Sequence, residues 1–291
     1  MGAANVIPGV SGGTMALLTG IFEPLIHAIK SFDLTTLKLI TSGRVKEAAR
    51  HINLDFLLPV GIGIVVSILS LARLLEYLFN HHAVYVWAFF FGLILASIWF
   101  VGKRIQRVTT PALLLFASGG ALAASIALVE PATENTSIPY LLLCGAIAMC
   151  SMILPGLSGS YVLLLMGNYQ LIMIDAVNDF NLAVLLPVAA GAGIGLLLFA
   201  RFLSWVFKQF HDQTVALLTG FIFGSLTILW PWKEAVTKTF RDGDAVKEKV
   251  TGYLYSLPEM NWETVLAIAV LVIGIGAIIA VETAASEKKQ D

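Results

Sequence analysis

Six runs of about 20 mostly apolar residues limit what this chain can fold into more than any other feature. Lipid offers the backbone no hydrogen-bonding partner, so a run of this length must be a helix that crosses about 30 Å of hydrocarbon. The composition agrees, because 58% of the residues are hydrophobic and only 13% are charged. We therefore predict an all-α, multi-pass membrane protein with spanning helices at residues 56–79, 84–101, 111–129, 183–207, 215–232 and 264–281.

The charged residues and cysteines exclude other classes of protein. The net charge is −1 and the basic residues form no phosphate-neutralising face, so the sequence does not predict nucleic-acid binding. Cys144 and Cys150 stand in one apolar stretch, separated by about 9 Å of helical rise, which is too far for a disulfide. The histidines show no metal-ligand spacing, so we predict no metal site and no cofactor.

Two further apolar segments, residues 5–29 and 139–172, are interrupted by Pro and Gly. These residues break a helix within the membrane unless neighbouring groups satisfy the freed backbone. We interpret both segments as re-entrant hairpins, each of which enters the membrane, turns and leaves on the side from which it entered.

The chain contains an internal repeat. IPGVSGGT at residues 7–14 recurs as ILPGLSGS at 153–160, and further matches follow each motif, including Gly20 with Gly167 and Gly92 with Gly220. We divide the chain into a first repeat, 1–130, and a second, 139–282. The first carries an additional basic stretch, 31–52, whose Lys and Arg residues stand among Leu and Ile. This pattern is typical of an amphipathic helix on an anionic membrane surface.

The positive-inside rule orients these segments. The basic loops at 30–50 and 103–107 are predicted to be cytoplasmic, and the connections at 80–83, 130–138 and 173–182, which lack Lys and Arg, external. The long mixed-charge loop at 233–261 is then external and the C-terminus cytoplasmic. Each half has one re-entrant hairpin and three spanning helices, an odd number, so we predict two inverted repeats, as in many secondary transporters.

The two PG-x-SG loops are the strongest candidate site. A re-entrant turn places backbone N–H groups and a helix N-terminus at membrane depth, where the positive potential suits an anion. The candidate ligands are the residues after each Pro-Gly pair, namely Ser11, Gly12, Gly13, Thr14, Ser158, Gly159 and Ser160. In the alternative interpretation, Pro and Gly only allow two helices to pack closely.

Four other polar residues are candidates for substrate binding. Arg73 and Arg201 are equivalent in the repeat and lie inside spanning helices, where a guanidinium is costly unless it is paired or faces water. Each could instead snorkel to the surface, and Arg73 could pair with Glu76. Glu23 could titrate during transport or could cap its helix. Asn5 could bind a ligand or satisfy broken backbone.

The segments GAANVIPGVSGGTMALLTGIFEPLI (2–26) and MILPGLSGSYVLLLMGNY (152–169) resemble the bacterial polyprenyl-phosphate translocase family, formerly a domain of unknown function. The resemblance covers essentially the whole chain. It implies a protein of the bacterial cytoplasmic membrane that returns undecaprenyl phosphate, the lipid carrier of cell-wall synthesis, from the outer to the inner leaflet. It also implies that the two loops and the intramembrane arginines receive the phosphate headgroup.

The resemblance leaves the coupling ion, protons or sodium, and the oligomeric state open. Members often carry Asp where this chain has Asn5, so a proton-carrying carboxylate is absent there. Members also commonly begin with a further helical stretch, and the first half here has no counterpart to residues 139–149.

Two other functions compete with translocation. Membrane-embedded polyprenyl-pyrophosphate phosphatases look similar, but their loop includes an arginine and works with nearby glutamates. The loops PGVSGG and PGLSGS contain neither, whereas hydrolysis needs a nucleophile or activated water and charge stabilisation. We therefore predict no catalytic residues and no enzymatic activity. A channel or carrier for a small inorganic anion is the second alternative.

Overall fold

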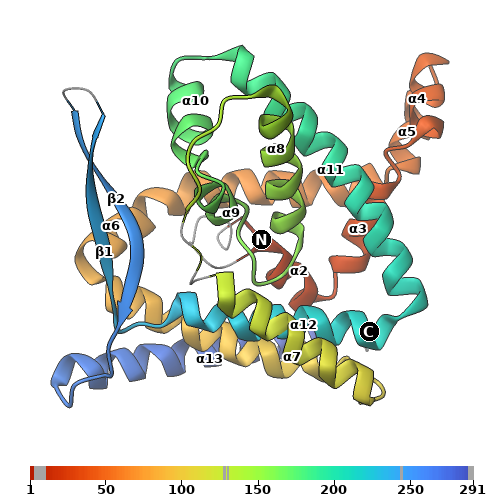
Figure 1. The fold of residues 1–291 in the computed structure, drawn as a ribbon. Helices are drawn as coiled ribbons and strands as arrows, with labels where there is room; N and C mark the ends of the chain where they lie inside the picture. Colours follow the sequence, from red (N-terminus) through yellow and green to blue (C-terminus); the bar gives the residue numbers. More distant parts are fainter. Residues whose placement is uncertain (3–10, 127–128, 130, 243–244, 288–291) are drawn as a thin grey trace.

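The computed structural model describes residues 1–2, 11–126, 129, 131–242 and 245–287, and most of them are helical (Figure 1). The helices are α2 (Gly12–Thr19), α3 (Phe22–Lys30), α4 (Leu34–Thr41), α5 (Val45–His51), α6 (Leu54–Gly102), α7 (Thr110–Ile126), α8 (Ile138–Ile153), α9 (Gly159–Leu165), α10 (Ala176–Asn178), α11 (Leu182–Gln209), α12 (His211–Leu229) and α13 (Trp262–Glu287). A π-helical turn, Leu171–Asp175, precedes α10, and strands β1 (Lys233–Asp242) and β2 (Ala245–Tyr255) pair antiparallel.

The predicted multi-pass helical architecture is confirmed. Among the described residues, five helical spans are long and apolar enough to cross a bilayer, namely Leu54–Leu75, Tyr77–Gly102, Leu182–Gln209, His211–Leu229 and Trp262–Thr283. Helix α7 has 17 residues, which corresponds to about 26 Å, slightly less than the roughly 30 Å hydrocarbon thickness. Helices α2 and α3 together form a further apolar pair that is bent by 114°, as in a broken span or a re-entrant loop.

Three predicted helical segments differ from the structure. The amphipathic stretch 31–52 forms two helices, α4 and α5, because the chain turns at Gly43, whose φ of +73° suits glycine. The predicted helices 56–79 and 84–101 are joined in α6, which is interrupted by non-helical backbone at His82 (φ −141°, ψ 39°).

The prediction of an all-α fold is wrong for residues 233–242 and 245–255. This part of the predicted external loop forms the β1–β2 hairpin, which projects from one end of the helical body (Figure 1). The sequence carries a hairpin signal, since Asp-Gly-Asp at 242–244 separates two segments rich in Val, Thr and aromatic residues. The high charge of these segments favoured the interpretation as a loop.

Glycines bring the long helices together. Helix α12 packs against α7, and a Cβ at Gly220 would lie 2.2 Å from a carbonyl oxygen of α7. Helix α13 packs against the second part of α6, and a Cβ at Gly92 would lie 2.1 Å from a carbonyl oxygen of α13. Small residues allow such close approach within a membrane. Gly92 and Gly220 are equivalent in the repeat, so the two halves pack against each other through matching positions.

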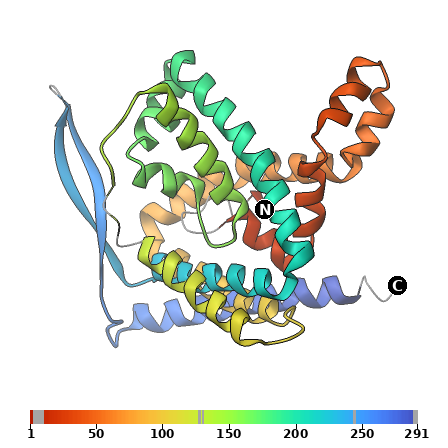
Figure 2. The same cartoon turned by 45° about the vertical axis from the view of Figure 1, so that its right-hand side comes forward.

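The ends of the molecule differ in character. In both views the β hairpin lies at one end and the α4–α5 pair at the other, and α13 runs from the first end toward the second (Figure 1, Figure 2). On the outer faces of α4 and α5, four aliphatic side chains are exposed, namely Leu34, Leu37, Ile40 and Val45.

Candidate functional site

The first motif starts helix α2 inside the protein. Ser11 is the N-cap: its backbone is extended (φ −111°, ψ 140°) and its hydroxyl accepts a hydrogen bond from the Gly13 N–H at 3.1 Å. Such a cap satisfies one of the N–H groups that a helix N-terminus leaves unpaired. Ser11, Gly12, Gly13 and Thr14 are all buried.

The second motif repeats the backbone geometry of the first but not its side-chain cap. Ser158 is the N-cap of α9, with φ −109° and ψ 126°. Its hydroxyl lies 2.8 Å from that of Ser160. Ser158 is half-buried and Ser160 is exposed. The equivalent serines of the two repeats therefore hold the same position at the start of a helix.

The two motif helices also end alike. Gly20 after α2 and Gly167 after α9 both have a φ of +76°, a conformation that suits glycine. In each case the next residue donates its N–H to the carbonyl five positions earlier, at 3.0 Å. This is the pattern of a Schellman cap. The repeat detected in the sequence thus corresponds to matching local structure at both ends of each helix.

The two motif loops contact each other. The Ser11 hydroxyl donates to the Met152 carbonyl at 3.0 Å, and the Gly156 N–H donates to the Thr14 hydroxyl oxygen at 3.0 Å. A Cβ at Gly13 would lie 2.2 Å from the carbonyl oxygen of Ile153. Only glycine permits this approach, so the motif loop of one half packs directly against that of the other.

A cavity of about 180 Å³, which we call the loop cavity, lies where the two motif loops meet. Ser11 from the first half and Ser158 and Ser160 from the second supply its hydroxyl groups. The rest of the lining is apolar and comprises Ala148, Met152, Leu157, Leu163 and Met173, together with the predicted Gly159. The sequence did not predict the five apolar side chains, because nothing distinguishes them from other residues in apolar segments. Among the described residues, none that lines this loop cavity is charged.

Among the described residues, the predicted Arg73, Arg201 and Glu23 do not line the loop cavity, and neither do Gly12, Gly13 and Thr14. Arg201 is half-buried on α11 and donates to the carbonyls of Leu197 and Phe32, both at 3.3 Å. Arg73 is exposed on α6, and the side chain of its considered partner, Glu76, lies outside the described side chains. Asn5 lies outside the described residues. A role for these residues in binding the headgroup stays a prediction.

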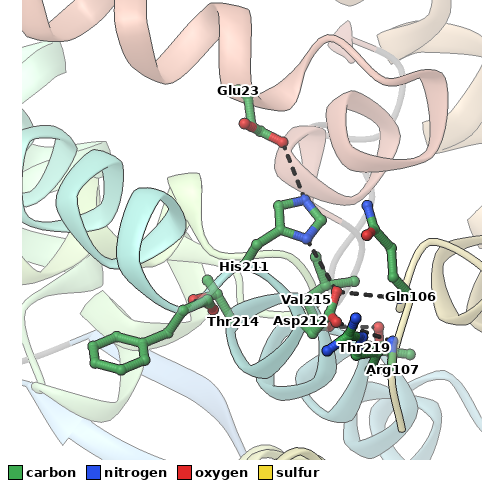
Figure 3. A network of polar contacts seen from close by, with 9 residues as sticks. Glu23, Gln106, Arg107, His211, Asp212, Thr214, Val215 and Thr219 are labelled. Atoms are coloured by element: carbon green, nitrogen blue, oxygen red, sulfur yellow. Dashed lines mark hydrogen bonds and ion pairs between the residues drawn. The ribbon is translucent and has the colours of Figure 1, made fainter.

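Glu23 belongs to a network that joins three elements (Figure 3). Its carboxylate on α3 lies 3.5 Å from His211 Nε2, and His211 Nδ1 lies 3.3 Å from Asp212 Oδ1 at the start of α12. Asp212 accepts the backbone N–H groups of Gln106 and Arg107 at 3.1 and 3.0 Å. Glu23 therefore links the first half to the second.

Arg104 was not among the predicted site residues. Its guanidinium donates to the Leu18 carbonyl in the last turn of α2 and lies beside Gly20. A cation there complements the negative end of the helix dipole. In the sequence, Arg104 stands out only as part of the basic loop 103–107. That loop predicts the orientation of the chain in the membrane but not the contact between Arg104 and α2. Helix α2 thus has the loop cavity at its N-terminus and a guanidinium at its C-terminus.

Lys233 is a half-buried cation at the start of β1. Its Nζ lies 3.7 Å from the centre of the Trp87 ring and donates to the Ile228 carbonyl. Burial lowers the pKa of Lys233 from 10.5 to about 7, because desolvation penalises the ammonium form.

We expect Lys233 to contribute stability that grows as the pH rises from about 7 toward 10.5. In this interval the unfolded state holds a proton at Lys233 that the folded state has released, so raising the pH favours folding. Lys233→Met should abolish this dependence. Thermal unfolding midpoints of both proteins at the two ends of the interval measure it, and an equal rise in the variant would assign the effect to another group.

Within the described residues, no three His, Cys, Asp or Glu side chains gather as a metal site. The groups that converge on the loop cavity are hydroxyls, which donate and accept hydrogen bonds without changing charge. This arrangement suits the binding of a small polar or anionic group.

Comparison with known proteins identifies the family. A family model described as undecaprenyl phosphate translocase-like matches residues 1–246. A polyprenyl-phosphate transporter of Vibrio cholerae is 41% identical over 237 residues, which are 81% of this chain and 77% of that protein. A polyprenyl-phosphate transporter of Staphylococcus aureus is 31% identical over 249 residues, 79% of this chain and 83% of that protein. No solved structure gives a significant match. The chain belongs to the undecaprenyl phosphate translocase-like family.

Proposed function

We propose that this protein moves undecaprenyl phosphate from the outer to the inner leaflet of the bacterial cytoplasmic membrane and so recycles the lipid carrier of cell-wall synthesis. The observation that carries the proposal is the meeting of the two motif loops around a hydroxyl-lined cavity in an apolar helical protein. The printed names of the two relatives, polyprenyl-phosphate transporters, support the same substrate and a transport role.

Two inverted repeats explain how one cavity could serve both leaflets. Several matching features support this arrangement: the N-cap serines, the Gly20 and Gly167 caps, and the packing of Gly92 and Gly220. The C-terminal end of α2 contacts Arg104 in the predicted cytoplasmic loop. The C-terminal end of α9 contacts residues 132–135 of the predicted external connection. Each half then supplies one re-entrant loop, and rocking one half against the other would expose the cavity to alternate sides.

The headgroup is bound, in this proposal, by the hydroxyls of Ser11, Ser158 and Ser160 and by the partial positive charge at the start of α2. Arg73 and Arg201 both lie toward the C-terminal ends of equivalent spanning helices, and the inverted arrangement puts these ends on opposite sides of the membrane. We assign Arg73 to capture of the phosphate at the outer surface and Arg201 to its release at the inner surface.

The orientation of the protein also follows from the proposal. Helices α4 and α5 carry exposed aliphatic side chains beside four basic residues, Lys38, Arg44, Lys46 and Arg50, which suits contact with the anionic inner leaflet. The C-terminal end of α13 lies toward the same side and the β hairpin toward the other (Figure 2). We therefore place the C-terminus in the cytoplasm.

The alternatives fit the loop cavity less well. A phosphatase needs a nucleophile or activated water with charge stabilisation, whereas the described lining has no carboxylate, histidine or arginine. A small-anion carrier would use the same hydroxyls, and we separate it from a lipid carrier by competition. Chloride and sulfate should not inhibit transport of polyprenyl phosphate.

The proposal is tested in proteoliposomes loaded with undecaprenyl phosphate in one leaflet. We expect the lipid to appear in the other leaflet with no release of inorganic phosphate. Release of phosphate from undecaprenyl pyrophosphate would instead identify an enzyme. If neither signal appears and chloride or sulfate flux does, the small-anion carrier is the correct function.

A further inference from the structure

A second cavity, of about 620 Å³, lies between α7, the end of α12, and the end of β2 with the residues that follow it. Its volume is typical of ligand-binding sites, which range over about 300–1,000 Å³. We call it the outer cavity. Its lining residues are Ala121, Ala124 and Ser125 of α7, Thr227 and Trp230 around the end of α12, and Tyr255, Ser256 and Leu257.

Small side chains on one face of α7 create this space. Ala121, Ala124 and Ser125 are spaced i, i+3 and i+4, so they line the same side of the helix. The opposite wall is held in place by hydrogen bonds. Trp230 Nε1 donates to the Ser256 carbonyl at 3.0 Å, and the Ser256 N–H donates to the Trp232 carbonyl at 2.9 Å.

The walls of the outer cavity are apolar in character. None of its described lining residues is charged. The hydroxyls of Ser125 and Thr227 donate to carbonyls in their own helices, both at 2.8 Å. The Trp230 N–H is likewise used within the wall. A cavity with such walls favours a hydrocarbon occupant over water or an ion.

Helix α12 lines the outer cavity and packs against the second motif loop, whose next residues line the loop cavity. A Cβ at Gly156 would lie 2.4 Å from the Phe221 carbonyl, so the second motif loop rests on the middle of α12. Thr227 lies six residues further along, at about 9 Å of helical rise. A long chain attached to a headgroup at the loops could therefore reach the outer cavity along α12.

We infer that the outer cavity binds the isoprenoid chain of a polyprenyl phosphate whose headgroup occupies the loop cavity. The inference rests on the proposed function. The loop cavity, at about 180 Å³, suits a phosphate on a single chain rather than the glycerol and two acyl chains of a bilayer phospholipid. A single-chain lipid phosphate is therefore the occupant that fits both cavities together.

The test compares Ala121→Trp with Leu122→Trp. Ala121 lines the outer cavity, whereas the adjacent Leu122 is exposed on the same helix and does not. Binding of undecaprenyl phosphate and of the short-chain farnesyl phosphate is measured for both variants and the wild type in nanodiscs of diacyl phospholipid. We expect Ala121→Trp to weaken binding of undecaprenyl phosphate about tenfold or more, with farnesyl phosphate and Leu122→Trp little affected.

Three results would overturn the inference. If Ala121→Trp leaves both affinities unchanged, the isoprenoid chain does not use the outer cavity or bilayer lipid fills it. If it weakens both ligands equally, the substitution acts on the headgroup site. If the wild type binds neither lipid, the proposed function fails as well. Should Ala121→Trp not fold, Ser125→Trp replaces it, because Ser125 is also exposed and lines the same wall.

Discussion

Replacing Gly13 with alanine is expected to abolish transport and to destabilise the protein. The added Cβ would lie 2.2 Å from the Ile153 carbonyl oxygen, so the two motif loops must separate or the backbone must shift. Overpacking of this kind typically costs about 1–3 kcal/mol. Separation would also stretch the hydrogen bonds from Ser11 to Met152 and from Gly156 to Thr14. Flux in proteoliposomes and the thermal unfolding midpoint measure the two effects.

Gly63→Ala is the matched control for Gly13→Ala. Gly63 lies within α6, and a Cβ there would meet nothing within 4 Å apart from its chain neighbours and the nearby backbone of its own helix. Alanine there should leave transport unchanged and stabilise the helix by up to about 1 kcal/mol. Full transport by Gly13→Ala at wild-type stability would contradict the close contact between the loops.

The double variant Ser158→Ala, Ser160→Ala is expected to lower transport without unfolding the protein. Both hydroxyls line the loop cavity, and a hydrogen bond to a charged group is worth about 1.5–3 kcal/mol, so flux should fall about tenfold or more. The fold should persist, because Ser158 makes no side-chain cap hydrogen bond and Ser160 is exposed. Initial rates of undecaprenyl phosphate flux in proteoliposomes measure this loss.

The control for the serine variants is Ser118→Ala. Ser118 is exposed on α7, away from the loop cavity lining, and its hydroxyl donates to the Leu115 carbonyl of its own helix. Its flux should equal that of the wild type. Equal flux in the double variant would remove the serines from the binding site.

The sequence predicted the elements of the loop cavity but not their assembly. Ser11 and Ser158 could be assigned to helix starts because a Pro-Gly break followed by Ser is a local signal that recurs in both halves. Their meeting depends on packing between residues far apart in the chain, which no local pattern encodes. Met152 and Met173 could not be identified for the same reason, since an apolar residue that lines a cavity resembles one that faces lipid.

Other differences have equally specific causes. Arg201 is predicted as a site residue because it is a charge within a spanning helix. Its side chain is long enough to reach the Phe32 carbonyl, a contact that sequence spacing does not reveal. Arg104, in a loop, contacts the end of α2 only because the chain folds back. The β1–β2 hairpin was missed because its segments are rich in charge, which suggested a loop.

In the proposed function, polyprenyl phosphate binds with its headgroup between the two motif loops. The most direct measurement is photo-crosslinking with a polyprenyl phosphate that carries a photoreactive group beside its phosphate, followed by mapping of the labelled residues. We predict labels in both loops, around Ser11 and around Ser158, at the cavity that they share. Labels confined to the surroundings of Arg73 or Arg201, with neither loop modified, would show that the headgroup does not bind between the loops.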